Sequence, residues 1–305
     1  MIPEMKKKGY SAPFSAAVIG SAATVAPILP PSVPLILYGS IAEVSIGRLF
    51  LGGVFPGFTM GFGMMVLTYF IAKKRNYERS QRASLREIGK AFADSILALL
   101  APLAIVGGIV TGHVTATESA IVAVWISIIL GVFVYKELTF KKIIDCMRSS
   151  LATSGALCFI IAASAPFGWI MAREGIPTLL VSGLEPIMHI PWLVLLMMLL
   201  GIMLIGTVLD GTPVIILLTP ILLPVIRQLG IDPVHFGVLL AITTMIGTIT
   251  PPVGTLMFVT SRIAGCNILE FTKEAWRYFL FLILLLFVFA FIPAITTWLP
   301  YTMMP

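Results

Sequence analysis

The chain has 305 residues, of which 58% are hydrophobic and 11% charged, and its mean hydropathy is +1.04. A soluble globular domain carries about 25% charged residues, so the composition excludes a soluble protein and indicates an integral membrane protein. The net charge of +6 does not indicate nucleic-acid binding, because the basic residues stand in short segments between apolar runs. The three scattered cysteines predict neither a disulfide framework nor a metal motif.

Apolar runs that are long enough to cross about 30 Å of hydrocarbon follow one another along the chain. The predicted crossing helices are 11–39, 49–72, 91–111, 118–135, 149–172, 236–260 and 279–298. A further apolar stretch, 191–227, is interrupted by the sequence DGTP at 210–213, which favours a re-entrant hairpin. Non-helical backbone at that depth must be shielded by protein or line a water-filled cavity. The predicted fold class is an all-α polytopic membrane protein.

The basic residues predict the orientation of these helices. With the N-terminus inside, the inside segments hold 17 of the 20 Lys and Arg residues, and only Arg48, Arg173 and Arg227 lie outside. The inside segments are then 1–10, 73–90, 136–148 and 261–277. The positive-inside rule favours this arrangement, with a cytoplasmic N-terminus and a C-terminus on the outer side. Two complete crossings at 191–227 would fit the charges equally well.

Adjacent prolines interrupt two similar apolar runs, ILPPSVPLILYGS at 28–40 and ITPPVGTLMFVTS at 249–261. The predicted crossings give the two runs opposite directions through the membrane, so they form an inverted repeat. Inverted repeats with broken helices are typical of secondary transporters, whose binding site lies at their midplane. The alternative interpretation is a pair of ordinary proline kinks in membrane helices.

The chemistry of the breaks predicts a cation site and an anion site. A proline has no N–H to bond the carbonyl four residues earlier, and a bare carbonyl in hydrocarbon is costly. A hard cation such as Na+ would satisfy these oxygens. The half-helices that begin near Ser32 and Gly254 should present free N–H groups to a carboxylate. Asp210, at the predicted hairpin tip, either binds the cation, holds the tip in place or caps the second arm.

Four stretches together resemble the large membrane subunit of tripartite ATP-independent periplasmic (TRAP) transporters. They are GSAATVAPILPPSVPLILYGSIAEVSIGRLFLGG, HVTATESA, LDGTPVIILLTPILLPVIRQLGIDPVHFGV and IGTITPPVGTLMFV. The resemblance covers essentially the whole chain. It implies an elevator-type, Na+-driven importer of organic carboxylates, of C4-dicarboxylate or sugar-acid type, in the bacterial inner membrane. It also implies two partners, a small four-helix membrane subunit and a periplasmic substrate-binding protein.

The resemblance places cation binding where hairpin tips meet broken helices. The predicted cation ligands are Ala26, Pro27, Pro30, Ser32, Asp210, Thr212, Gly247, Thr248, Thr250 and Gly254. The predicted substrate contacts are Ser32, Val33, Gly211, Thr212, Gly254 and Thr255. No catalytic residue and no cofactor other than the coupling ion is expected, because Asp210 has no second aspartate beside it and no serine stands in a nucleophile motif.

The predicted domains follow the repeat. Residues 1–72 form the second part of the first repeat, 73–148 are connecting helices, and 149–305 form the second repeat. Because family members are longer at the N-terminus, the hairpin of the first repeat is expected to be absent from these residues. The alternatives that remain open are a stand-alone Na+/dicarboxylate symporter and a non-functional fragment of the permease.

Overall fold

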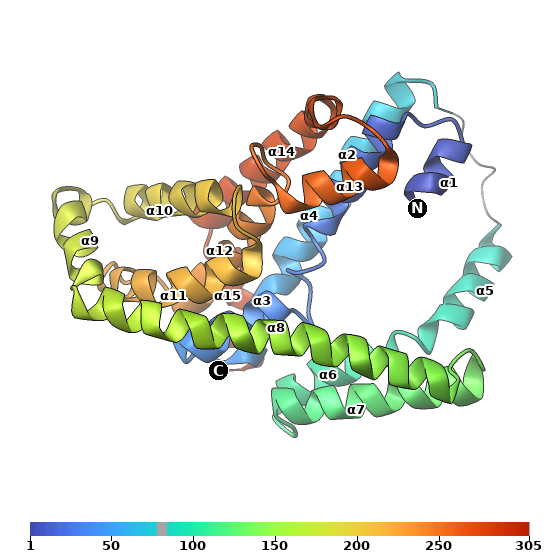
Figure 1. Ribbon diagram of the computed structural model, residues 1–305, viewed down its shortest axis with the longest axis horizontal. Coiled ribbons are helices and arrows are strands. Elements are labelled where there is room, and N and C mark those ends of the chain that lie inside the picture. The colour runs from blue at the N-terminus through green and yellow to red at the C-terminus, as the bar shows by residue number, and fades with distance from the viewer. Residues whose placement is uncertain (78–83, 305) are drawn as a thin grey trace. The chain divides into compact units, whose positions relative to one another are not determined.

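The computed structural model describes residues 1–77 and 84–304, and every regular element in them is a helix. Part of the predicted inside segment 73–90 lies outside the described residues. The chain divides into two compact units (Figure 1): unit 1 holds residues 1–78 and 167–305, and unit 2 holds residues 79–166. Both Pro-Pro segments and the stretch 191–227 therefore belong to unit 1.

Unit 1 contains most of the helices. They are α1 (Ile2–Lys7), α2 (Ala12–Ala23), α3 (Val33–Ala42), α4 (Ile46–Lys74), α9 (Ile176–Leu184), α10 (Pro191–Gly206), α11 (Gly211–Gln228), α12 (Pro233–Gly247), α13 (Thr255–Ala264), α14 (Ile268–Phe291) and α15 (Ala294–Met303). Unit 2 contains α5 (Leu85–Ile96), α6 (Leu100–Val110), α7 (Ala116–Ile129) with a π-helical turn (Leu130–Val134), and most of α8 (Phe140–Arg173).

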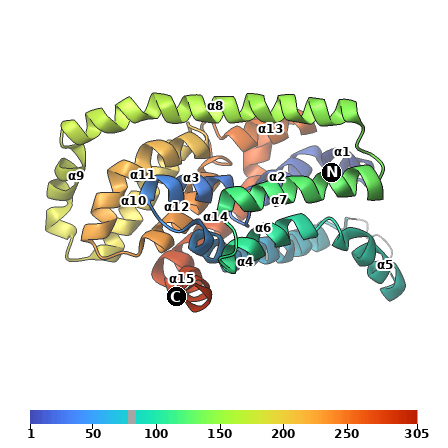
Figure 2. The same ribbon diagram turned by 90° about the horizontal axis from the view of Figure 1, so that it is seen from below.

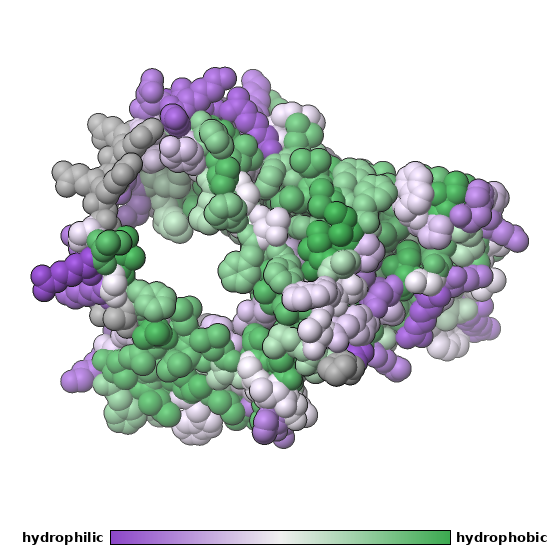
Figure 3. All heavy atoms as spheres, turned by 180° about the vertical axis from the view of Figure 1, so that it is seen from behind, coloured by the Kyte–Doolittle hydropathy of each residue, from purple (hydrophilic) through white to green (hydrophobic). Residues whose placement is uncertain are grey.

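Within residues 1–77 and 84–304, five helices are long and apolar enough to cross a membrane. They are Ile46–Lys74, Ala116–Val134, Phe140–Arg173, Gly211–Gln228 and Ile268–Phe291. Apolar side chains also cover much of the face seen in Figure 3, and hydrophilic residues gather in separate patches on it. An apolar exterior is what hydrocarbon requires of a protein embedded in it. The predicted fold class, an all-α polytopic membrane protein, is confirmed.

Each Pro-Pro segment interrupts a helical run. Residues 24–32 separate α2 from α3, residues 248–254 separate α12 from α13, and both Pro-Pro bonds are cis. Ser32 is the N-cap of α3, and its hydroxyl accepts a hydrogen bond from the Leu35 N–H at 3.2 Å. Gly254 precedes α13 and has a φ of +44°. This backbone conformation suits a residue without Cβ.

The two broken helices cross each other inside unit 1. Helix α2 packs against α13 and α3 packs against α12 (Figure 1), so each half-helix contacts the opposite half of the other run. Gly20 allows the first contact, because a Cβ there would lie 3.1 Å from Thr260 Oγ1. At the second contact the Tyr38 hydroxyl donates to the Pro233 carbonyl at 2.8 Å.

The stretch 191–227 forms a helical hairpin. Helices α10 and α11 are joined by residues 207–210, and both pack against α12, while α11 also packs against α3. Residues 234–247 of α12 are all buried. Helix α11 continues through Pro220 and Pro224. Helix α12 therefore forms the centre of unit 1.

Three predicted helices have wrong bounds, and two helices, α1 and α9, lie in segments that were predicted as loops. The predicted helix 91–111 is two helices, α5 and α6, separated by a turn at 97–99. The predicted helix 149–172 begins at residue 140 as α8. The predicted helix 279–298 begins at residue 268 as α14, because an Asn267 capping box starts the helix among charged residues that an apolar pattern does not register, and it ends at residue 291. Helix α9 lies within the predicted outside loop 173–190.

Candidate functional site

The tip of the α10–α11 hairpin contacts the break between α12 and α13. The Gly254 N–H donates to the Thr207 carbonyl at 2.8 Å. The Thr255 hydroxyl donates to Asp210 Oδ1 at 3.3 Å. Asp210 is the N-cap residue of α11, but its side chain makes no capping hydrogen bond. The structure therefore favours a link between Asp210 and the break over the capping alternative.

Glycines allow this close contact. A Cβ on Gly247 would lie 2.7 Å from the Gly206 carbonyl carbon, closer than real Cβ contacts. A Cβ on Gly211 would collide with the Met245 side chain. Helices α10 and α12 approach each other backbone to backbone at the Gly206–Gly247 pair, in the way that small residues allow in membrane helices.

The polar groups of the second break are largely paired within the chain. The Thr248 carbonyl accepts the N–H groups of Leu256 at 3.0 Å and Met257 at 3.3 Å, and the Gly247 carbonyl accepts the Thr250 N–H at 2.9 Å. The expectation of bare carbonyls at Gly247 and Thr248 is thus wrong for this structure, because the Thr250 amide bonds the Gly247 carbonyl and the first turn of α13 brings its amides back to the Thr248 carbonyl. A carbonyl oxygen has two lone pairs, so the Gly247 oxygen, which accepts one N–H, can still bind a cation, whereas the Thr248 carbonyl oxygen already accepts two N–H groups.

The start of α13 also differs from the expectation of free N–H groups. The amides of Gly254, Leu256 and Met257 are all bonded, to the carbonyls of Thr207 or Thr248. The hydroxyls of Thr248 and Thr250 donate back along α12, to the carbonyls of Met245 and Ile246 at 2.7 Å each. An anion at this helix start would have to compete with the hairpin tip for the Gly254 amide.

The first break lies against α4. The Ser32 hydroxyl donates to the Pro27 carbonyl. The Ile28 carbonyl approaches Gly53 closely, and a Cβ on Gly57 would lie 2.6 Å from Leu29 Cδ2. Of the predicted ligands here, Ala26 and Pro30 have carbonyls that accept no hydrogen bond from the described residues, and Val33 is 49% exposed.

The predicted site residues form two groups in the structure. The second group collects Asp210, Gly211, Thr212, Gly247, Thr248, Thr250, Gly254 and Thr255 around the hairpin tip. The first group, Ala26, Pro27, Pro30, Ser32 and Val33, surrounds the other break. Among the described residues no hydrogen bond joins the two groups.

The sequence analysis missed the residues that hold the tip. Thr207 offers its carbonyl to Gly254, and Gly206 faces Gly247 and the Thr244 carbonyl. Their only sequence signal is a glycine at each end of the hairpin tip, at positions 206 and 211. A backbone contact of this kind leaves no side-chain pattern, so the sequence could not specify it.

Known proteins match the chain over almost all its length. The family described as the DctM component of tripartite ATP-independent periplasmic transporters matches residues 1–295. A putative TRAP transporter large permease protein of Haemophilus influenzae is 37% identical over 96% of this chain and 69% of its own length. The 2,3-diketo-L-gulonate TRAP transporter large permease protein YiaN of Escherichia coli is 33% identical over 96% and 69%. The sialic acid TRAP transporter large permease protein SiaM of Vibrio cholerae is 36% identical over 98% and 70%.

Proposed function

The chain belongs to the family of large permease subunits of tripartite ATP-independent periplasmic transporters, and from this premise we propose that it is the transport subunit of a Na+-coupled importer of organic carboxylates. The family consists of membrane transport subunits, not enzymes, and the chain is a multi-pass protein of the inner membrane. The coupling ion, the class of substrate and the mechanism are the proposal.

One observation carries the proposal of ion coupling, namely the contact between the hairpin tip and the second break. It brings the Asp210 carboxylate beside the start of α13, within hydrogen-bond distance of the Thr255 hydroxyl at 3.3 Å. Carboxylate, hydroxyl and carbonyl oxygens are the ligands that a hard cation prefers. Asp210, Thr212, Gly247, Thr248, Thr250 and Gly254 would hold Na+ here, and Ala26, Pro27, Pro30 and Ser32 would hold it at the first break.

The substrate is proposed to be an organic carboxylate. Two of the relatives are named for 2,3-diketo-L-gulonate and sialic acid, which are both acids. The N-terminal ends of α3 and α13 carry the positive ends of their helix dipoles, which favour an anion. The groups proposed to contact the carboxylate are Ser32, Val33, Gly211, Thr212, Gly254 and Thr255.

An elevator mechanism requires one part of the protein to carry the site while another part stays in place. The division of the chain into two compact units supports this, because unit 1 contains both breaks and the hairpin. We propose that unit 1 moves with the bound ions and substrate. The proposed partners are a small membrane subunit and a periplasmic binding protein that delivers the substrate.

Uptake into proteoliposomes tests the proposal. The chain, its small subunit and its binding protein would be reconstituted under an inward Na+ gradient with radiolabelled sialic acid, diketogulonate and C4-dicarboxylates. We expect Na+-dependent uptake that Asp210→Asn reduces at least about tenfold. Asp145→Asn is the matched control, because Asp145 is exposed in unit 2, with an Arg148 partner 4.0 Å away. Equal uptake by the two variants would remove Asp210 from the site, and uptake without the binding protein would favour a stand-alone symporter.

A further inference from the structure

The start of each broken helix contacts a residue of a helix later in the chain, and the two contacts occupy matching positions. The Arg75 guanidinium carbon lies 5.2 Å from the centroid of the Phe14 ring. His235 Nδ1 lies 2.6 Å from Thr296 Oγ1. The numbers Phe14 and His235 differ by 221, as do Arg75 and Thr296, and the two Pro-Pro segments are also 221 residues apart. The two contacts differ in their chemistry, but each joins residues at equivalent positions of the repeat.

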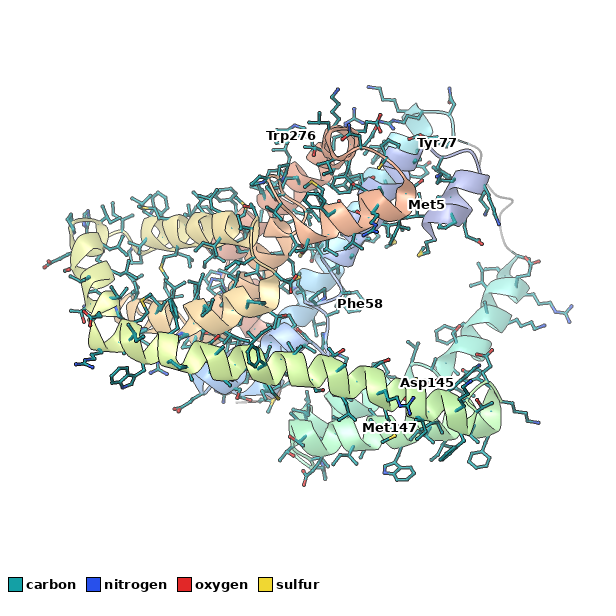
Figure 4. All side chains as sticks on the ribbon, viewed as in Figure 1. Met5, Phe58, Tyr77, Asp145, Met147 and Trp276 are labelled. Carbon is teal, nitrogen blue, oxygen red and sulfur yellow. The ribbon has the colours of Figure 1, made fainter. Side chains whose placement is uncertain are left out.

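A tyrosine hydroxyl contacts the N-cap residue at both places. The Tyr77 hydroxyl donates to Ser11 Oγ at 3.4 Å, and Ser11 is the N-cap of α2. The Tyr301 hydroxyl donates to Asp232 Oδ2 at 2.6 Å, and Asp232 is the N-cap of α12. Ser11 and Asp232 are again 221 residues apart. Figure 4 shows Tyr77 where α4 ends, beside α1.

Each contact also includes the long helix of the other repeat. Arg75 forms an ion pair with Glu274, near the start of α14, at 2.7 Å. The Thr296 carbonyl lies 2.8 Å from the place where a Cβ on Gly52, near the start of α4, would be. We call Ser11, Phe14, Arg75, Tyr77 and Glu274 the first joint, and Gly52, Asp232, His235, Thr296 and Tyr301 the second joint.

The second joint contains a buried hydrogen bond between His235 and Thr296. His235 is 2% exposed and Thr296 is 0% exposed. The Thr296 hydroxyl oxygen lies within hydrogen-bond distance of both His235 Nδ1, at 2.6 Å, and the Pro293 carbonyl oxygen, at 3.0 Å. His235 Nε2 is buried and makes no hydrogen bond with the described residues. A change of either His235 or Thr296 therefore leaves a buried polar group unpaired.

We propose that the two joints are positioning devices that set the depth of the two broken helices, and with it the placement of each break. Helix α12 has 15 residues, which corresponds to about 22 Å, and it is buried from residue 234 to residue 247. A tightly packed helix of this kind moves as one piece, so a shift at His235 displaces the carbonyls at its other end. His235, Thr296, Phe14 and Arg75 act through the helices and touch neither ion nor substrate.

A pair of capping contacts supports the correspondence, because their donors are 221 residues apart and their acceptors, Ala42 and Ala264, are 222 residues apart. Lys6 Nζ donates to the Ala264 carbonyl at the end of α13 at 2.9 Å, and Arg227 Nη2 donates to the Ala42 carbonyl at the end of α3 at 3.4 Å. Lys6 and Arg227 are also 221 residues apart. In each case a cation from one repeat caps the second half-helix of the other.

Helix α15 (Figure 2) contains two neighbouring threonines, Thr296 and Thr297, which provide a matched test. Both hydroxyls donate to the Pro293 carbonyl, but Thr297 is only half-buried, and of the two threonines only Thr296 forms a hydrogen bond with His235. Hydrogen–deuterium exchange of the full chain in lipid nanodiscs would follow the amides of residues 250–257. We expect Thr296→Val to speed exchange of these amides by about tenfold, whereas Thr297→Val and Thr296→Ser leave it unchanged. Equal exchange in the two valine variants would overturn the proposal, as would an increase spread evenly over all helices.

The first joint has its own variant pair. Arg75→Lys keeps a positive charge near Glu274 but removes the planar group over Phe14, and Lys74→Gln changes the neighbouring exposed residue. Only Arg75→Lys should speed exchange of the amides at residues 24–33, and unchanged exchange there would limit the proposal to the second joint.

Uptake measurements rest on the proposed function, and in them Thr296→Val should raise the Na+ concentration for half-maximal uptake at least about threefold. Because the exchange readout needs no transport, it still decides the proposal if no uptake is observed.

Discussion

At the residue scale, the contact between hairpin tip and break depends on backbone groups that only glycine leaves accessible. Gly247 stands where any Cβ would press on the backbone of Gly206 at 2.7 Å. Gly254 has φ of +44°, and a Cβ there would lie 2.9 Å from the Thr250 carbonyl oxygen. In both places the neighbouring atom is backbone, which cannot rotate away as a side chain could. The geometry of the site is therefore sensitive to single methyl groups.

We predict that Gly247→Ala destabilises the protein by about 1–3 kcal/mol, the usual cost of overpacking. The measurement is the thermal unfolding of the purified chain in detergent, followed by tryptophan fluorescence. Gly201→Ala is the control, because Gly201 lies in α10 and a Cβ there would meet no atom of the described residues within 4 Å. Melting temperatures that fall equally in both variants would contradict the close approach of α10 and α12.

The half-buried Cys266 should show an unusual pH dependence. Burial raises the pKa of its thiol above the ordinary value, which is about 8.5. A raised pKa keeps the thiol protonated to higher pH, and only the thiolate reacts. In a Cys146→Ser, Cys158→Ser variant, the maleimide reaction of the folded chain should therefore rise at higher pH than that of the detergent-denatured chain. Identical pH profiles for the two states would mean that Cys266 is not shielded.

At the element scale, the main question is how deep the α10–α11 hairpin lies. The tip contacts the break between α12 and α13, and so meets a broken helix at its interruption. Helix α11 has 18 residues, about 27 Å, which is close to the thickness of the hydrocarbon. Length alone would allow a full crossing, whereas the contact with the break favours a tip that stops within the membrane.

Labelling of a cysteine at the tip separates these two possibilities. Val208 is 56% exposed, so Val208→Cys on a cysteine-free background offers a reactive thiol there. A re-entrant tip should react with a charged maleimide in inside-out vesicles at least about tenfold more slowly than a cysteine at position 146. We expect Na+ to change this rate further if Asp210 binds the ion. A rate equal to that at position 146 would mean that both arms cross completely.

At the scale of the whole molecule, the charge distribution predicts which side each connection faces. Cys146 lies in the predicted inside segment 136–148 and is exposed, and His113 lies in the short connection between α6 and α7 on the predicted outer side. An impermeant maleimide applied to intact spheroplasts should label His113→Cys and leave a Cys146-only chain unlabelled until the membrane is opened. The reverse pattern would invert the proposed topology, and labelling of both would contradict the assignment of α7 as a crossing helix.

The sequence predicted the fold class better than it predicted where each helix begins and ends. Composition and apolar run length identified a helical membrane protein, because hydrocarbon admits few other structures. The same criterion failed at α14, whose first turns contain Lys273, Glu274 and Arg277 and yet continue the helix. It also failed at 91–111, where a predominantly apolar run contains a turn at 97–99. An apolar pattern indicates whether a segment lies in hydrocarbon or in water. Hydrogen bonding decides where the helix of that segment begins and ends.

By itself the sequence determined the membrane class, the family and the two proline breaks, because each of these depends on local composition or spacing. Only the tertiary structure decided which groups meet. In the structure, the Gly254 amide donates to the Thr207 carbonyl, and the first amides of α13 donate to the Thr248 carbonyl. His235 forms a hydrogen bond with Thr296. These contacts join residues far apart in the chain through single backbone or side-chain atoms. Such pairings arise from the packing of helices, which no local pattern in the sequence specifies.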